Sequence, residues 1–370
     1  MSTDTIFPYP PDNAALLYYQ AFLMIERIDV IMLKTLADLL AGRIKPNEEI
    51  KKYIKSCQNI IDLIVLAAEV PNCNWGLDYS KGALTPPHLG YFRYVARLIL
   101  ADAQLSASTG NYKQALSRCL TTRKMGHHIK KGDLLCYALG TTIISLADKS
   151  IRDILGNVSR DVTTLLWFKN ELIQSESRVF SLKSGVEIEL QKLSIYMSKD
   201  TAEKAFEPDF YEWAKVNLPK HVADYAIRAP EEFFMQNEKY WNSYKDRVNA
   251  ALDLPYKEAY SSLSRLQAEI KQKADEPNAA LTPFWASNFP LAYYVSMRMS
   301  NFYNAIKVAI ELYIIKAKTG RLPDKLPANL PKDLFSSNDF EYTKTDNDFI
   351  LRCRGKDLRK EEILQYEFKV

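Results

Sequence analysis

Apolar and small residues recur three or four positions apart through most of the chain, the spacing that places one buried face on a helix. The pattern is clearest over residues 87–129, where two helical stretches meet near Gly110. Gly110 can take the left-handed conformation that ends a helix, and the Asn111 side chain can cap the next helix. We therefore predict an antiparallel helical hairpin that turns at this point.

A second hairpin is predicted directly after the first. Asp133 can cap a helix over residues 134–154, Gly156 can end it, and Ser159 or Asp161 can start the next one. Gly110 and Gly156 lie 46 residues apart, closer to the longer helical-repeat periods than to the 34-residue one. Two units do not establish an array, so a single hairpin within a larger helical domain remains the alternative.

Helical periodicity also extends over both flanks of these hairpins. Residues 14–40 predict a helical region with a break near Asp29, and residues 48–68 predict one helix that ends before Pro71. Residues 180–280 are less regular and rich in aromatic side chains, and we expect them to pack against the hairpins and to cover a groove. Helices in this part are predicted over residues 184–205, 209–228, 231–250 and 256–274.

The C-terminal part changes from a helical to an extended pattern. A last long helix is predicted over residues 291–318, stopped by Gly320. Alternating apolar residues then indicate short strands, the first two joined at Asp346-Asn347, a hairpin signal. The strands are predicted at residues 340–343, 349–353 and 364–370.

Gly110-Asn111-Tyr112-x-x-Ala115-Leu116 resembles the turn and second helix of a tetratricopeptide repeat. In that family, stacked helix pairs form a groove that binds protein or peptide partners, so the resemblance implies such a partner here. The long last helix, a Gly-x-Leu-Pro turn and a small sheet also resemble the layout of pseudopilin-type subunits.

Three longer stretches resemble an uncharacterised bacterial family of helical-repeat proteins. They are PPDNAALLYYQAFL at residues 10–23, PNCNWGLDYS at residues 71–80 and DFILRCRGKDL at residues 348–358. This resemblance covers nearly the whole chain and implies architecture, but it transfers no catalytic residue. Its members often carry an export leader, which this sequence lacks, so the compartment stays open between a soluble protein as written and an exported one.

The predicted fold class is mainly α, with antiparallel helical hairpins similar to tetratricopeptide or α-solenoid folds and a small C-terminal antiparallel β-sheet. We divide the chain into a helical-hairpin domain at residues 1–290 and a long helix with a small sheet at residues 291–370. The second part is expected to pack on the first.

Composition excludes several classes of protein. The net charge of +4 is too small for a nucleic-acid partner, because a binding face for that polyanion needs clustered excess cation. The five cysteines are scattered without a C-x-x-C pair, which argues against a zinc or redox motif. The longest uncharged stretches fall short of the roughly 20 apolar residues of a membrane span. We expect no cofactor, and the oligomeric state stays open.

One basic stretch is a candidate binding site. Between Asp102 and Asp133 there is no acidic residue, whereas Arg123, Lys124 and His127 could hold a carboxylate or a phosphate near a helix end. The alternative is a solvated face, because basic residues are favoured near helix C-termini. His127 and His128 are adjacent and so point to different sides of a helix, which makes a metal site improbable.

Trp75, Asp78 and His88 surround an aromatic, polar loop. They could form a ligand pocket at the mouth of the hairpins, with Asp78 and His88 as polar anchors. The alternative is a loop that Trp75 pins to the core. If the pocket is real, substitution of Asp78 and His88 abolishes ligand binding and leaves the melting temperature unchanged. If the loop is structural, the same substitutions lower the melting temperature.

The functional hypothesis is a non-enzymatic helical-repeat protein that binds a partner or acts as a scaffold, with a place in the cell envelope. The alternative is a hydrolase acting on a small or carbohydrate substrate, since paired acids beside aromatic rings can mark a glycosidase. No catalytic residue is assigned. The acids considered for that alternative are Glu203, Glu207, Asp209 and Glu212.

Overall fold

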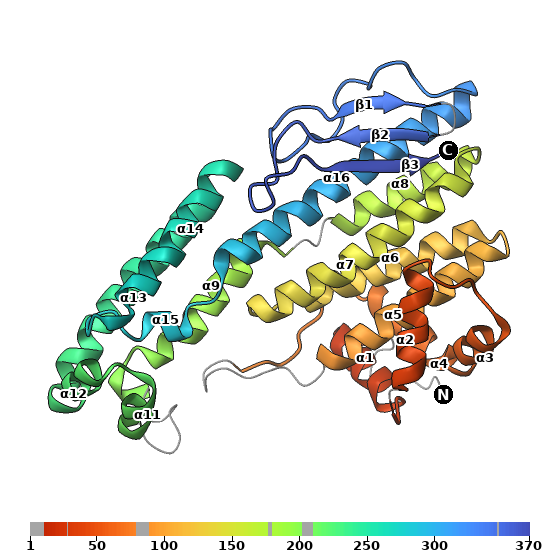
Figure 1. The fold of residues 1–370 in the computed structure, drawn as a ribbon. Coiled ribbons are helices and arrows are strands. Elements are labelled where there is room, and N and C mark those ends of the chain that lie inside the picture. Colours follow the sequence, from red (N-terminus) through yellow and green to blue (C-terminus); the bar gives the residue numbers. More distant parts are fainter. Residues whose placement is uncertain (1–10, 28, 79–88, 177–179, 202–209, 346–347) are drawn as a thin grey trace, which may run out of the picture.

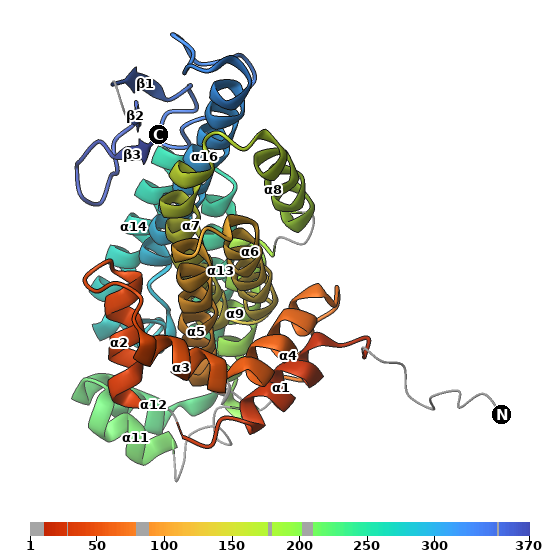
Figure 2. The same cartoon turned by 90° about the vertical axis from the view of Figure 1, so that its right-hand side faces the viewer.

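The computed structural model describes residues 11–27, 29–78, 89–176, 180–201, 210–345 and 348–370. Within these ranges the chain is mainly helical, with a three-stranded antiparallel sheet near the C-terminus (Figure 1). The predicted fold class is therefore confirmed. Figures 1 and 2 show the order of the elements across the body of the molecule: the sheet comes first, then α16, then the α6–α7 pair, then α5 and finally the N-terminal helices.

The N-terminal helices begin at side-chain caps. The side chains of Asn13, Asp29 and Asn47 accept hydrogen bonds from the first backbone N–H groups of α1, α2 and α3. These helices and the next are α1 (Ala14–Leu23), α2 (Val30–Leu40), α3 (Glu48–Ser56) and α4 (Gln58–Glu69).

The single helix predicted over residues 48–68 is wrong, because the helix breaks at Cys57. This break lets α3 pack on α5 while α4 packs on α1 and α6. One straight helix could not turn its apolar residues toward both sets of partners, and the periodicity by itself does not show the change of direction.

Four longer helices form the centre of the molecule and contain both predicted hairpins. At the first turn Gly110 has a φ of 81° and Asn111 accepts a hydrogen bond from the Gln114 N–H. At the start of the second, the Asp133 side chain accepts from the Cys136 N–H. The helices are α5 (Leu89–Ser108), α6 (Tyr112–Ile129), α7 (Leu134–Leu155), which continues into the 3-10 turn η2 (Gly156–Val158), and α8 (Val162–Glu176).

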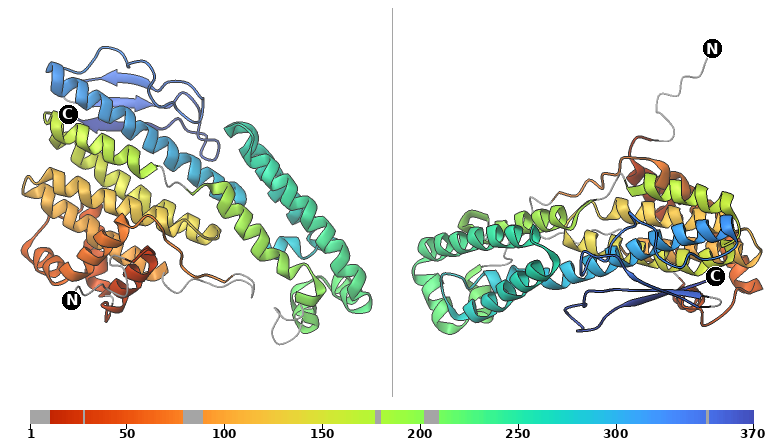
Figure 3. Two further views of the ribbon diagram at one scale, coloured as in Figure 1. Left: turned by 180° about the vertical axis from the view of Figure 1, so that it is seen from behind. Right: turned by 90° about the horizontal axis from the view of Figure 1, so that it is seen from above.

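Residues 182–201 and 210–285 form an arm that projects from this body (Figures 1 and 3). Two predicted helices are shorter than expected, since the first ends at Leu193 and the second is divided at Pro219. Among the described residues, the aromatic rings of the arm pack mostly on one another, while α9 packs on α7 of the second hairpin. The elements are α9 (Leu182–Leu193), η3 (Ser194–Tyr196), α11 (Phe210–Asn217), α12 (Lys220–Arg228), α13 (Pro230–Leu252), α14 (Tyr256–Gln272), η4 (Lys273–Asp275) and α15 (Thr282–Trp285).

Helix α16 (Phe289–Thr319) connects the arm to the sheet (Figure 3). Asn288 caps its first turn, and Gly320 ends it with a φ of 79°. The strands β1 (Glu341–Lys344), β2 (Asp348–Arg352) and β3 (Gln365–Lys369) follow in that spatial order, close to the predicted positions. Phe349 lies opposite Phe368 in the register, and both side chains are buried.

Two apolar cores meet along the central helices. The first gathers side chains of α1 to α5 with parts of α6 and α7, and the second joins α6 to α16 with the sheet. Helices α5, α6 and α7 contribute to both cores, so they hold the body together. The predicted domain division after residue 290 stays a prediction.

Helix α7 is the most apolar long helix of the described residues. Together with η2 it spans Leu134–Val158, which is long and apolar enough to cross a membrane, with a mean hydropathy of 1.3. However, 67% of the 18-residue stretch of this segment that has this hydropathy is buried inside the fold. A core helix of a folded domain has the same composition, so this is weak support for a span.

The turn at Gly110 can be tested by substitution. Gly110→Val should lower the free energy of unfolding by about 1–2 kcal/mol, because a β-branched residue is strained at a positive φ. Urea denaturation followed by circular dichroism measures the change. Gly90→Ala is the matched control, since Gly90 lies in α5 with open space around it and should keep or slightly raise stability. Wild-type stability of Gly110→Val would contradict the turn.

Candidate functional site

Two glycines bring α6 and α7 into backbone contact. A Cβ placed on Gly140 would lie 2.5 Å from the Gly126 carbonyl oxygen and 2.5 Å from Cγ of Lys130. A Cβ on Gly126 would lie 2.6 Å from Cγ1 of Ile144. No other residue fits at either position without movement, so the end of α6 is drawn deep into the core and the Lys130 stem lies along α7.

This contact buries a row of basic side chains. Arg123, His127 and Lys130 are 2%, 5% and 7% exposed, respectively. Their spacing of four and three residues places them on one face of α6. The face borders a cavity of about 330 Å³ between α6, α7, the end of α8 and α16. Acidic, aromatic and basic side chains from the other helices complete the wall, namely Asp148, Glu176, Tyr137, Tyr303 and Lys307.

Arg123 is held by a buried ion pair with Asp148 of α7. Its guanidinium also lies 3.9 Å from the centroid of the Tyr303 ring. Burial raises the pKa of Asp148 above its ordinary value, although the Arg123 charge opposes that rise. Burial would lower the pKa of Arg123, but the Asp148 carboxylate outweighs it and the pKa is raised. The pair therefore anchors the inner end of the cavity.

Lys307 of α16 is held in a similar way at another part of the wall. Its ammonium lies 3.1 Å from the Glu176 carboxylate at the end of α8. The Lys307 ammonium also lies 4.7 Å from the Tyr303 ring centroid. The Tyr303 ring therefore contacts two cations, Arg123 and Lys307. Each acid of the cavity is thus matched to one cation.

Lys130 is the cation of the cavity that has no such match. Among the residues that the structure describes it forms no ion pair, and its ammonium lies 4.3 Å from the Tyr137 ring centroid. Burial lowers the pKa of Lys130 to about 8, and the charge of Arg123 adds to that effect. The cavity therefore contains one net positive charge at neutral pH.

His127 lies beside this charge with both ring nitrogens buried and without a hydrogen-bond partner. Burial lowers the pKa of His127 well below 6.5, and the charges of Arg123 and Lys130 lower it further. The ring is neutral at pH 7 and offers one donor and one acceptor. A buried polar ring without a hydrogen-bond partner among the described residues is costly, so the ring has free capacity for one donated and one accepted hydrogen bond.

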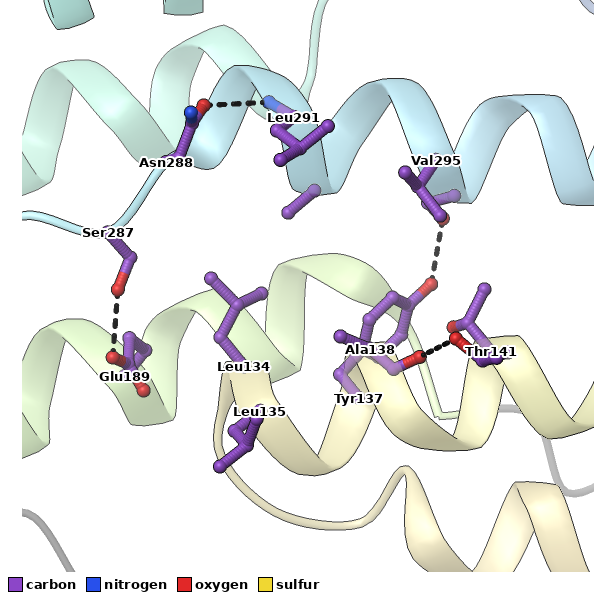
Figure 4. Close-up of a pocket in the computed structure, with 13 residues that line it drawn as sticks. Leu134, Leu135, Tyr137, Ala138, Thr141, Glu189, Ser287, Asn288, Leu291 and Val295 are labelled. Carbon is purple, nitrogen blue, oxygen red and sulfur yellow. Dashed lines mark hydrogen bonds between the residues drawn. The ribbon is translucent and has the colours of Figure 1, made fainter. Parts of the chain in front are cut away.

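An apolar groove of about 460 Å³ lies next to the cavity, between α7 and α16. Tyr137, Thr141 and Ser296 line both spaces. Figure 4 shows the Tyr137 hydroxyl directed at α16, where it shares a hydrogen bond of 2.8 Å with the Ser296 hydroxyl. The other walls are mainly aliphatic, with Leu134, Leu135, Ala138, Leu291, Ala292 and Val295.

The predicted basic site is only partly assembled. Arg123 and His127 line the cavity, whereas Lys124 lies outside it and pairs with Glu69 at 2.7 Å. His128 points away from the cavity, as expected from its adjacency to His127, and its Nδ1 lies 3.0 Å from the Tyr18 hydroxyl. The solvated-face alternative does not apply to Arg123 and His127, because both are buried.

The pocket predicted at Trp75, Asp78 and His88 stays a prediction. Trp75 is buried, and its Nε1 donates a hydrogen bond to the His128 carbonyl oxygen at 3.0 Å. Asp78 is exposed, and His88 lies outside the described residues. The described part of the loop thus corresponds to a segment that Trp75 pins to the core.

Sequence reasoning did not single out Lys130, Tyr137, Asp148, Tyr303 or Lys307. Asp148 had one available signal, because it is the first charged residue after the uncharged stretch at residues 134–147. Gly126 and Gly140 had another, since a glycine within a helical pattern often marks close packing. No sequence signal pointed to Tyr303 or Lys307, because α16 is brought to the cavity by the tertiary fold.

Comparison of the chain with protein-family models, curated proteins and solved structures found no match. The resemblances to helical-repeat and pseudopilin-type proteins therefore stay predictions. The described residues contain no group of three or more His, Cys, Asp or Glu side chains that could hold a metal ion. The side chains that line the cavity define the chemistry that is possible there.

Substitution of Arg123 tests the ion pair. Arg123→Met should lower the free energy of unfolding by about 3–5 kcal/mol, because it leaves the Asp148 carboxylate buried without a partner. The double variant Arg123→Met/Asp148→Leu should recover much of this loss, since both charges are then absent. Denaturation of the single and double variants gives the coupling. Strictly additive losses would contradict the pairing.

Proposed function

We propose that this chain is a non-enzymatic binding protein whose cavity takes an anionic group. The observation that carries the proposal is the buried Lys130 ammonium, which has no ion-pair partner among the residues that the structure describes and lies beside the His127 ring, whose nitrogens have no hydrogen-bond partner among them either. An isolated buried charge is unfavourable, and an anion that enters the cavity would supply the missing charge and hydrogen bonds.

The other charges of the cavity direct an anion to Lys130. Arg123 and Lys307 already have carboxylates beside them, so their charges are largely balanced. The neutral ring of His127 can donate one N–H to an anion oxygen, and the Tyr137 hydroxyl lies near the same end. Charge-assisted hydrogen bonds of this kind are the strong ones in a site with little water.

Binding fits the cavity better than hydrolysis. Both of its carboxylates are held by cations, so neither is a free general acid or base. Of the acids considered for a hydrolase, the structure describes Glu212, whose side chain is 64% exposed and paired with Lys215 at 2.6 Å. A scaffold role, a peptide partner and a place in the cell envelope rest on sequence resemblance alone.

Lys130→Met should abolish anion binding and at the same time stabilise the free protein. The pKa of Lys130 is lower in the fold than its ordinary value, so the unfolded chain holds this proton more tightly. The charged side chain therefore destabilises the fold at neutral pH, and its removal should raise the free energy of unfolding by about 1–3 kcal/mol.

Thermal denaturation and titration with acetate, followed by amide shifts in NMR spectra, measure both effects. Lys113→Met is the control. Lys113 is exposed on the same helix and does not line the cavity, so this substitution removes the same charge at a place outside the cavity. Undiminished acetate binding by Lys130→Met would overturn the proposal, and a loss of stability would show that Lys130 supports the fold.

Anion affinity should also depend on pH. The protonated form of Lys130 is the one that attracts an anion, and its pKa of about 8 places the change just above neutrality. The affinity for acetate should be nearly constant from pH 6.5 to 7.5 and should fall by about tenfold per unit above pH 8. A flat profile to pH 9.5 would contradict the role of Lys130.

A further inference from the structure

We propose that the ligand is a single-chain amphiphile, with its anionic head at Lys130 and its apolar chain in the groove between α7 and α16. This inference rests on the proposed function and extends it from an anionic group to a class of ligand. It is carried by the position of an apolar groove beside a charged cavity, because Tyr137, Thr141 and Ser296 line both spaces.

The position of Lys130 sets the direction of such a ligand. Its ammonium faces the Tyr137 ring at 4.3 Å, and Tyr137 stands at the border of the two spaces. A head group bound at Lys130 and His127 therefore leaves the rest of the molecule to extend past Tyr137 into the groove. The hydroxyls of Tyr137 and Ser296, now bonded to each other, are placed to bind the oxygens of the head group.

The walls of the groove suit a hydrocarbon chain. Figure 4 shows Leu134 on α7 and Leu291 and Val295 on α16 lining it from the two sides. Leu135 is 45% exposed and Leu291 is 37% exposed, although both are aliphatic. An apolar chain in the groove would remove these surfaces from water, which is the usual source of affinity for such ligands.

A peptide fits the groove less well than a hydrocarbon chain, because a peptide backbone needs hydrogen-bond partners along its length. Most polar groups of the groove are already engaged, and the Thr141 hydroxyl, at the border with the cavity, is the exception among the described residues. The Ser287 hydroxyl donates to Glu189 at 2.9 Å, and the Asn288 side chain accepts from the Leu291 N–H at 3.1 Å. The Thr142 hydroxyl donates to the Ala138 carbonyl oxygen at 2.9 Å.

The experiment is a chain-length series of straight-chain carboxylates from acetate to decanoate, titrated by calorimetry or NMR below their micellar concentrations. The affinity of the wild-type protein should rise about two- to fourfold per added methylene. Acetate binding without any gain with length would overturn the amphiphile and leave the proposed function standing. No binding of acetate or decanoate would overturn both.

Ala138→Trp tests the place of the chain. Ala138 is exposed on α7 and lines the groove but not the cavity, so an indole there fills the groove without entering the core. The variant should bind acetate as wild type does and should lose the gain with chain length. Leu166→Trp is the control, because Leu166 is 38% exposed on α8 and lines neither space. An unchanged series in Ala138→Trp would overturn the assignment of the groove.

Three further ligands define the class. Decyl phosphate and decanoate distinguish a phosphate head from a carboxylate head, and tighter binding of either one supports an anionic amphiphile. Decyltrimethylammonium should not bind, and binding equal to that of decanoate would overturn the role of the cavity. An N-acetylated tetrapeptide of Leu and Val residues with a free C-terminus is the competing class, and its tighter binding than decanoate would overturn the inference in favour of a peptide.

Discussion

The approach of Gly126 to Gly140 is the contact on which the rest of the site depends. Helices normally keep their backbones apart by the width of their side chains, and here the two facing residues are glycines, which have none. The end of α6, which would otherwise leave the core, is held inside it. Arg123, His127 and Lys130 are buried as a consequence.

Burial of this row leaves the molecule with an unbalanced charge in its interior. Arg123 and Lys307 have carboxylate partners, whereas Lys130 lies only against an aromatic ring. A buried ammonium weakens the fold that contains it, so its presence is hard to explain by stability. Binding sites often lower the stability of the free protein, and a bound ligand of opposite charge raises the stability again.

Helix α16 unites the parts of this site. Its first turns line the apolar groove with Leu291 and Val295, and its middle turns line the charged cavity with Tyr303 and Lys307. Because the same helix also contacts the arm and the sheet, it places both spaces along one rigid wall. A long helix can do this since it presents a new part of one face every three or four residues.

The sequence alone determined most helices, several of their caps and the strands, because these depend on neighbours along the chain, whereas the break at Cys57 did not show in the periodicity. Gly110 and Gly320 take the conformation that favours glycine, and Asn111 and Asp133 cap the helices that follow them. Tertiary structure decided which polar residues are buried, because a basic stretch near a helix end has the same local pattern whether water or another helix covers it. Arg123 and His127 could therefore be named from the sequence but not placed. Lys130, Asp148 and Tyr303 required the packing of three helices to come together.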